Sequence, residues 1–134
     1  MILNLKKVIL NGFIACVPLI TGCSPLDSEL DGIKSISARD AASMFTTRNA
    51  VIVDVREDGE WAEGHIAGAI HIPLSQLDKR LPELAQYKSR SVIMQCRSGK
   101  RSAKATLIAK AAGFSKVLNM DGGIQAWTSS GLTL

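Results

Sequence analysis

The sequence predicts an α/β fold with a central, mostly parallel, five-stranded sheet that carries helices on both faces. From residue 33 onward, short apolar segments alternate with segments of helical character, an order typical of parallel sheets. Residues 50–55 form a nearly continuous β-branched run, as expected for a strand buried on both faces. The roughly 100 residues involved suit one small domain.

Strands and helices are expected to follow one another in a regular order. The expected strands are residues 33–36, 50–55, 69–72, 92–95 and 116–119. The expected helices are residues 37–45, 58–63, 75–80, 102–112 and 124–127, and Pro82 begins a further short turn. Parallel sheets of this kind bind ligands beyond the carboxyl ends of their strands, where Asp54 and Cys96 lie.

Residues with strong end preferences set the expected helix boundaries. Ser37 opens a segment that resembles a capping box. Ser75 is expected to cap the helix over residues 75–80. Gly64 and Gly113 follow helical segments and are expected to end them, because glycine accepts the left-handed backbone found there.

The first 22 residues have the features of a secretory signal. Two lysines give a positive start, and residues 8–20 are apolar apart from Asn11 and Gly12. The run Ile20-Thr21-Gly22-Cys23 resembles the bacterial lipobox, in which the cysteine is lipidated and becomes the first residue. Residues 8–22 would span roughly 22 Å as a helix, short of the ~30 Å hydrocarbon core, which disfavours an uncleaved anchor.

The chain therefore divides into a leader, a tether and a domain. Cys23 is the preferred lipidation site, because a cut before Cys16 would leave an apolar core of only about eight residues. The expected divisions are a lipoprotein-type signal peptide (1–22), a lipidated cysteine with a short polar tether (23–32) and the folded domain (33–134). We expect a lipid-anchored protein of the bacterial cell envelope that faces outside the cytoplasm, on the periplasmic side in a Gram-negative cell.

Charge argues against a nucleic-acid partner. Removing residues 1–22 takes away two lysines and no acid, so the formal net charge falls from +4 to +2. No basic stripe with interleaved aromatic residues is present in the sequence.

Chemistry is concentrated in the loop that begins at Cys96. Residues 96–101 read Cys-Arg-Ser-Gly-Lys-Arg and join an expected strand to an expected helix. A thiol that faces backbone N–H groups and cations has a lowered pKa and reacts as the thiolate. Once the leader is processed, Cys96 is the only free thiol and has no partner for an intramolecular disulfide. The polar neighbours disfavour the alternative, a buried cysteine that only fills space.

Three segments in register resemble the single-domain rhodaneses, which are sulfurtransferases. The first is Asp54-Val55-Arg56-Glu57 with Trp61 and the run from Glu63 to Pro73, Glu-Gly-His-Ile-Ala-Gly-Ala-Ile-His-Ile-Pro. The second is the Cys96 loop, and the third is the run 119–127, Asn-Met-Asp-Gly-Gly-Ile-Gln-Ala-Trp. Together they cover nearly the whole domain in the family's order.

The resemblance implies a chemistry and a set of roles. In this family the cysteine takes a sulfane sulfur from an anionic donor such as thiosulfate, becomes a persulfide, and passes the sulfur to cyanide or a thiol. Cys96 would then be the nucleophile. Arg97, Ser98, Gly99, Lys100 and Arg101 would form the substrate-binding cradle, with Arg101 best suited to an oxyanion because of its planar fork. No cofactor is implied.

Loop length and the remaining polar residues narrow the alternatives. The six-residue loop resembles the sulfurtransferase form, whereas rhodanese-like phosphatases of the Cdc25 type carry one more residue. Asp54 and Arg56 either brace the cradle or form a structural ion pair, and the structural role is favoured. The two histidines, His65 and His71, lack metal-ligand spacing, so no metal site is expected, and turn or packing roles are favoured over a Cys96–His71 dyad.

Two other functions remain open from the sequence. The domain can serve as a persulfide carrier or docking module for a partner protein, with poor turnover on small donors. Alternatively, Cys96 can act as a sensor that is oxidised by peroxide. The physiological donor and acceptor, the oligomeric state and the choice between inner and outer membrane are not set by the sequence, although Ser24 in place of Asp favours the outer membrane by resemblance to enterobacterial sorting.

Overall fold

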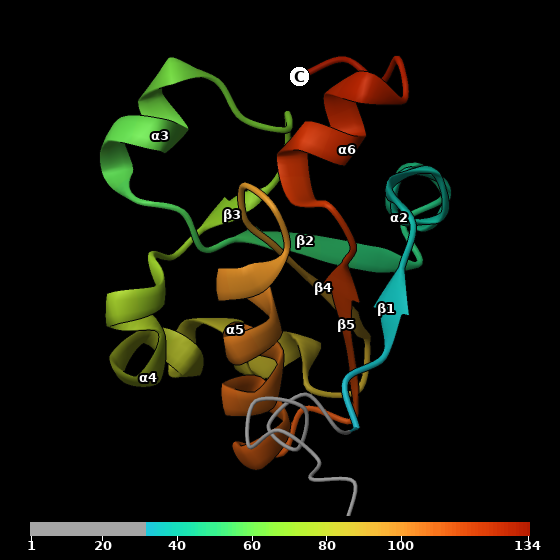
Figure 1. Ribbon diagram of the computed structural model, residues 1–134. Helices are drawn as coiled ribbons and strands as arrows, with labels where there is room; N and C mark the ends of the chain where they lie inside the picture. Colours follow the sequence, from blue (N-terminus) through green and yellow to red (C-terminus); the bar gives the residue numbers. More distant parts are fainter. Residues whose placement is uncertain (1–31) are drawn as a thin grey trace, which may run out of the picture.

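Five parallel strands form a single sheet in the order β1-β5-β4-β2-β3 (Figure 1). The computed structural model describes residues 32–134. The strands are β1 (Ser35–Ile36), β2 (Ala50–Asp54), β3 (Ile70–His71), β4 (Ser91–Gln95) and β5 (Lys116–Met120). Every neighbouring pair is parallel, which confirms the predicted five-stranded α/β sheet.

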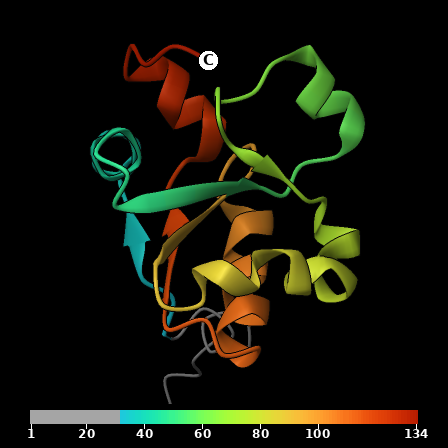
Figure 2. The ribbon, with the colours of Figure 1, turned by 180° about the vertical axis from the view of Figure 1, so that it is seen from behind.

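Helices cover both faces of this sheet (Figures 1 and 2). The helical elements are α2 (Ala38–Thr46), α3 (Asp58–Glu63), η1 (Leu74–Gln76), α4 (Leu77–Arg80), η2 (Leu81–Tyr87), α5 (Lys100–Ala111) and α6 (Gly123–Ser129). Two hydrophobic cores result, one between the sheet and α4, η2 and α5, and the other between the sheet and α2 and α6. The short helix α3 lies at the carboxyl edge of the sheet.

The two central strands supply both cores. In β2, Val53 faces one core and Ile52 the other, and in β4, Met94 and Ile93 divide in the same way; all four are fully buried. Alternation of this kind explains the continuous apolar run, because each face of a covered parallel strand must be apolar. β2 and β4 also pair with each other in register, which brings the ends of both strands to one edge.

Expected element boundaries lie within two residues of those in the structure, and one expected helix cap is wrong. Ser37 caps α2 by accepting a hydrogen bond from the backbone N–H of Asp40. Ser75 caps no helix, because it lies inside the 3₁₀ turn η1, and α4 begins after Gln76 without a side-chain cap. Helix α5 begins at Lys100, two residues earlier than expected, since Gly99 adopts a left-handed backbone at its N-cap.

The signal peptide, the tether and the lipidation site at Cys23 lie outside the described residues. In the part of the chain that the structure describes, no helix combines the length and the apolar character needed to cross a membrane.

Candidate active site

Cys96 lies at the carboxyl end of β4, at the start of the loop that leads to helix α5. This loop rises between α3 and α6 in both views of the ribbon (Figures 1 and 2). The side chain is only 1% exposed, and Sγ accepts two hydrogen bonds. The backbone N–H of Gly99 donates from 3.1 Å and the hydroxyl of Ser102 from 3.3 Å. Both donors point at the place where thiolate charge resides.

Hydrogen bonds outweigh burial in setting the acidity of this thiol. Burial alone raises the pKa of Cys96, because a thiolate is poorly solvated inside the protein. The Ser102 hydroxyl and the backbone N–H groups of Ser102, Gly99 and Ser98 stabilise the thiolate, and the net pKa of Cys96 is lowered. The N-terminus of the 12-residue helix α5 adds its positive dipole end at the same place. The lowered pKa agrees with the expectation for this thiol, whereas its role as the nucleophile stays a prediction.

The first turn of α6 supports the Cys96 loop through two backbone hydrogen bonds. The backbone N–H of Ile124 donates to Cys96 O at 2.8 Å, and that of Gln125 donates to Arg97 O at 3.2 Å. Gly123 makes this contact possible, since a Cβ on its backbone, which has a φ of 58°, would collide with the carbonyl oxygens of both loop residues. Gly123 thus allows α6 to pack directly against the backbone of the Cys96 loop.

Ser102 and Asn119 extend the network behind the thiol. The Ser102 hydroxyl lies 2.6 Å from Asn119 Oδ1 as well as 3.3 Å from Cys96 Sγ, and both residues are buried. One hydroxyl carries one hydrogen, so Ser102 donates to one of these acceptors at a time, and a thiolate is the stronger attraction. From the sequence, Ser102 was expected only to begin a helix, and Asn119 was not among the expected site residues.

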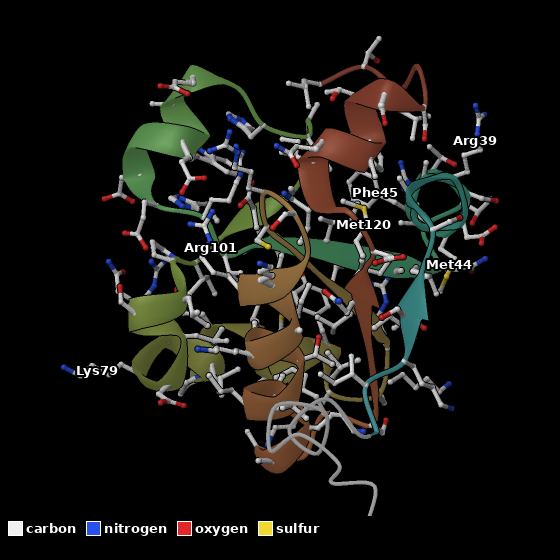
Figure 3. All side chains as sticks on the ribbon, in the orientation of Figure 1. Arg39, Met44, Phe45, Lys79, Arg101 and Met120 are labelled. Atoms are coloured by element: carbon white, nitrogen blue, oxygen red, sulfur yellow. The ribbon has the colours of Figure 1, made fainter. Side chains whose placement is uncertain are left out.

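The loop cations differ in their surroundings. Arg97 and Lys100 are exposed, as is Ser98. Arg101 instead points from the start of α5 toward α3 (Figure 3) and forms two parallel hydrogen bonds with the carboxylate of Glu60, at 2.6 and 2.8 Å. The cradle residue expected to bind an oxyanion is therefore held in an ion pair, with a partner that sequence analysis did not identify.

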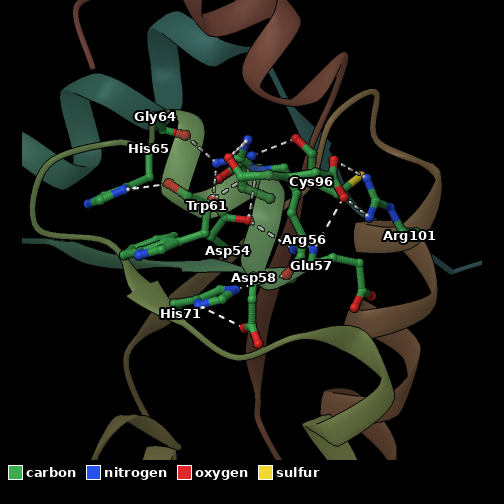
Figure 4. Close-up of polar contacts among 12 residues, drawn as sticks. Asp54, Arg56, Glu57, Asp58, Trp61, Gly64, His65, His71, Cys96 and Arg101 are labelled. Carbon is green, nitrogen blue, oxygen red and sulfur yellow. Dashed lines mark hydrogen bonds and ion pairs between the residues drawn. The ribbon is translucent and has the colours of Figure 1, made fainter.

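Asp54 and Arg56 form a buried ion pair at the end of β2 (Figure 4). The Arg56 guanidinium donates to both carboxylate oxygens, the shortest contact being 2.7 Å, and the side chains are 0% and 6% exposed. The remaining donors of Arg56 reach Glu60 O at 3.2 Å and Gly64 O at 2.8 Å. Arg56 thus connects Asp54, at the end of β2, to the backbone of α3 and of the residue that follows it. These contacts are consistent with the structural role favoured from the sequence.

The two histidines pack against Trp61. Their rings stack on the indole, with centroid distances of 3.6 Å for His65 and 4.5 Å for His71. His71 Nε2 also hydrogen-bonds to Arg56 O at 2.9 Å. Packing roles were favoured for both histidines, and Trp61, on which they stack, is partly exposed. Within residues 32–134, no group of three or more histidine, cysteine or acidic side chains is arranged to hold a metal.

A groove of about 220 Å³ runs beside the Cys96 loop, between α3 and α6. Its lining residues are Arg56, Glu60, Glu63, Gly64, Ile124, Gln125, Thr128 and Leu134. Glu60 and Ile124 link the groove directly to the loop, since the first pairs with Arg101 and the second holds Cys96 O. A molecule that approaches the thiol from this side would contact both α3 and α6.

Comparisons with known proteins agree with this architecture. The family profile described as a rhodanese-like domain matches residues 37–130. A sulfurtransferase of Allochromatium vinosum is 36% identical over 107 residues, which cover 80% of this chain and 94% of that protein. The human single-domain sulfurtransferase TSTD1 has a similar solved structure, with a TM-score of 0.66 and 28% identity, covering 73% of this chain and 97% of that one.

A second kind of relative is also similar. The putative sulfur carrier protein YrkF of Bacillus subtilis is 43% identical over 77 residues. The match covers 58% of this chain and 40% of that protein, so the similarity concerns one part of a longer relative.

Proposed function

Because this chain belongs to the rhodanese-like family of sulfurtransferases and sulfur carriers, we propose that it transfers a sulfane sulfur through a persulfide on Cys96. The donor in this proposal is thiosulfate or a similar small anion, and the acceptor is a thiol or cyanide. One observation carries the proposal: Cys96 Sγ accepts hydrogen bonds from Gly99 N–H and Ser102 Oγ–H at the N-terminus of α5.

The first step is attack of the Cys96 thiolate on the outer sulfur of the donor. With thiosulfate, a new S–S bond forms at Sγ, the S–S bond of the donor breaks, and sulfite leaves with that bond's electron pair. The product is the Cys96 persulfide, whose terminal sulfur is again anionic. In this proposal the N–H groups that lower the pKa of the thiol also stabilise this second anion.

The second step returns the cysteine to its starting state. A thiolate or cyanide attacks the terminal sulfur of the persulfide, and Cys96 leaves as the thiolate. The hydrogen bonds from Gly99 and Ser102 favour this departure, because a low thiol pKa makes a good leaving group. An acceptor bound in the groove between α3 and α6 would lie next to Glu60 and Ile124, which both contact the loop.

A carrier role is the second candidate, and the similarity to the putative sulfur carrier of B. subtilis favours it. In this case Cys96 loads once and holds the sulfur until a partner protein takes it. Carrier and enzyme share the first step and differ in turnover, so they are distinguished by adding an acceptor.

Intact mass spectrometry of the chain before and after thiosulfate tests the proposal. We expect a gain of one sulfur atom that cyanide removes and that Cys96→Ser abolishes. Repeated sulfite release with cyanide supports the enzyme, and a single load that is retained in the presence of cyanide supports the carrier. No gain with any sulfane donor would contradict both.

The proposed location is the cell envelope, through a lipid on Cys23. The motif Ile20-Thr21-Gly22-Cys23 supports this part of the proposal. Cys23→Ser is expected to release the protein from the membrane fraction, as measured by fractionation and immunoblotting. A variant that stays with the membrane would contradict lipid anchoring at this residue.

A further inference from the structure

Glu60 and Arg101 form an ion pair at the edge of the Cys96 cradle. Arg101 Nη1 lies 2.6 Å from Glu60 Oε1 and Arg101 Nη2 lies 2.8 Å from Glu60 Oε2, a two-pronged geometry that matches a guanidinium to a carboxylate. The side chains are 32% and 30% exposed, so the pair is accessible to solvent without being fully hydrated. Forty-one positions separate the two residues in the chain.

Two features of α3 keep the Glu60 carboxylate in place before any donor arrives. Glu60 Oε1 also accepts a hydrogen bond from the backbone N–H of Glu57, at 3.3 Å, as part of a capping box. The Glu60 carbonyl accepts a hydrogen bond from the buried Arg56. The side chain and the backbone of Glu60 are thus both fixed, which lowers the entropic cost of holding Arg101.

Carboxylates of α3 and its N-cap lie close to Arg101 of the Cys96 loop and offset part of the loop's positive charge. The loop contributes three cations, of which Arg97 and Lys100 are exposed and Arg101 is paired. Helix α3 and its N-cap contribute the four carboxylates Glu57, Asp58, Glu60 and Glu63 and no cation. The Arg101 guanidinium lowers the pKa of Glu60 to about 2, so the pair remains charged on both sides at neutral pH.

We propose that Glu60 is a specificity-determining residue, which neutralises Arg101 and biases the Cys96 cradle toward sulfur donors with one negative charge over dianions. This inference rests on the proposed sulfur transfer and names the donor class that the same site favours. The hydrogen-bond donors of the loop can bind any anionic sulfur. The net charge of the surrounding residues, in contrast, affects dianionic donors more strongly than monoanionic donors. A dianion gains about twice as much as a monoanion from each added positive charge.

Two donors that differ by one charge make the proposal testable. Thiosulfate is a dianion and methanethiosulfonate is a monoanion, and both deliver their outer sulfur to a thiolate with a sulfur oxyanion as leaving group. In each reaction Cys96 Sγ forms one S–S bond, the donor loses one, and sulfite or methanesulfinate departs with the electron pair. The ratio of kcat/KM for the two donors therefore reports charge selectivity.

Glu60→Gln removes the charge and keeps the size of the side chain. We expect the ratio of kcat/KM for thiosulfate to that for methanethiosulfonate to rise about threefold or more, because the cradle gains one net positive charge. The rise should shrink as ionic strength increases, since salt screens an exposed charge. Glu60→Asp, which keeps the charge, should leave the ratio near that of the wild type even where shorter reach lowers both rates.

A matched control is available outside the Cys96 cradle. Glu83 forms an exposed ion pair with Arg80 at 2.7 Å, and neither residue belongs to the site. Glu83→Gln changes the net charge of the chain by the same amount as Glu60→Gln, and we expect it to leave the donor ratio unchanged.

Three outcomes would overturn the inference. They are an unchanged ratio in Glu60→Gln, an equal rise in Glu83→Gln, and an equal rise in Glu60→Asp. If Glu60→Gln lowers kcat/KM for thiosulfate and for methanethiosulfonate by the same factor, the ratio is unchanged. Glu60 would then have only a structural role. Failure of the proposed function looks different, because the wild-type protein would then gain no sulfur from either donor in intact mass spectra.

Discussion

Two arginine–carboxylate pairs border α3, and they differ in burial and in what they join. The Asp54–Arg56 pair is buried and connects residues two positions apart, and Arg56 also donates to the carbonyls of Glu60 and Gly64. The Glu60–Arg101 pair is about one-third exposed and joins α3 to the nucleophile loop. Similar chemistry therefore serves two purposes: the first pair holds the scaffold, and the second reaches the site.

Burial decides how much each pair contributes to stability. A buried pair that loses one partner leaves an uncompensated charge in the interior, which is costly. An exposed pair loses little, because water replaces the partner. Mutations on the two sides of α3 should therefore separate stability from activity.

The largest expected effect is on activity and comes from the nucleophile itself. Cys96→Ser should abolish persulfide formation, because serine has no sulfur and its hydroxyl is a poor nucleophile at neutral pH. Its free energy of unfolding should stay within about 1 kcal/mol of the wild type, since the two side chains are similar in size. Sulfur transfer assays and urea denaturation measure the two quantities. Residual transfer would contradict the assignment of Cys96.

On the scaffold side, the largest expected effect follows from Asp54→Ala. The change leaves Arg56 buried without its carboxylate, and we expect a loss of about 3–5 kcal/mol in the free energy of unfolding. Urea denaturation measures the loss. Asp78→Ala, at an exposed position on α4, is the control and should change stability by about 0.5 kcal/mol or less. A loss of under about 1 kcal/mol in Asp54→Ala would show that the buried pair is not structural.

An intermediate effect is expected from Ser102→Ala, which removes one hydrogen bond to Cys96 Sγ. Loss of a donor to the thiolate raises the pKa of Cys96, so a smaller fraction of the enzyme is active at neutral pH. We expect about a tenfold lower rate at neutral pH, recovered as the pH rises. The pH dependence of kcat/KM for thiosulfate measures this shift.

Ser115→Ala, an exposed position at the opposite edge of the sheet, is the control for Ser102→Ala. Its pH profile should coincide with that of the wild type. If Ser102→Ala lowers the rate equally at every pH, then Ser102 does not act through the pKa of the thiol.

The smallest expected effect is the contribution of Glu60 to stability. The folded-state pKa of Glu60 is about 2, below the ordinary value of 4.5, so its contribution is complete above pH 4.5 and is lost as the pH falls toward 2. Partial exposure limits it to about 1 kcal/mol or less. Glu60→Gln should be less stable than the wild type by this amount at pH 7 and equally stable near pH 2, as measured by urea denaturation at both pH values. A difference independent of pH would contradict the linkage.

Local patterns made much of the fold predictable. The β-branched run of β2 and the glycine after α5 act over a few residues, so the sequence shows them directly. The Cys96 loop was also recognisable in the sequence, because its cysteine, glycine and cationic residues lie within six consecutive positions. The Ser75 cap failed as a prediction, since the chain there forms a 3₁₀ turn before α4 begins.

The residues that surround Cys96, in contrast, come together only through the order of the strands in the sheet. β4 lies between β2 and β5, so the segments that follow all three strands meet at one edge of the sheet. This arrangement brings Glu60 to Arg101, Asn119 to Ser102 and Gly123 to the backbone of the Cys96 loop. None of these contacts joins neighbours in sequence.

The sequence by itself thus determined the α/β class and most of the element boundaries, and it singled out Cys96 as the candidate nucleophile, because these depend on composition and on spacing over one or two turns of chain. The tertiary structure alone decided which carboxylate neutralises Arg101 and which hydroxyl donates to the thiol. Contacts of this kind depend on the packing of distant segments, which is fixed only when the parallel strands pair and the helices cover both faces of the sheet.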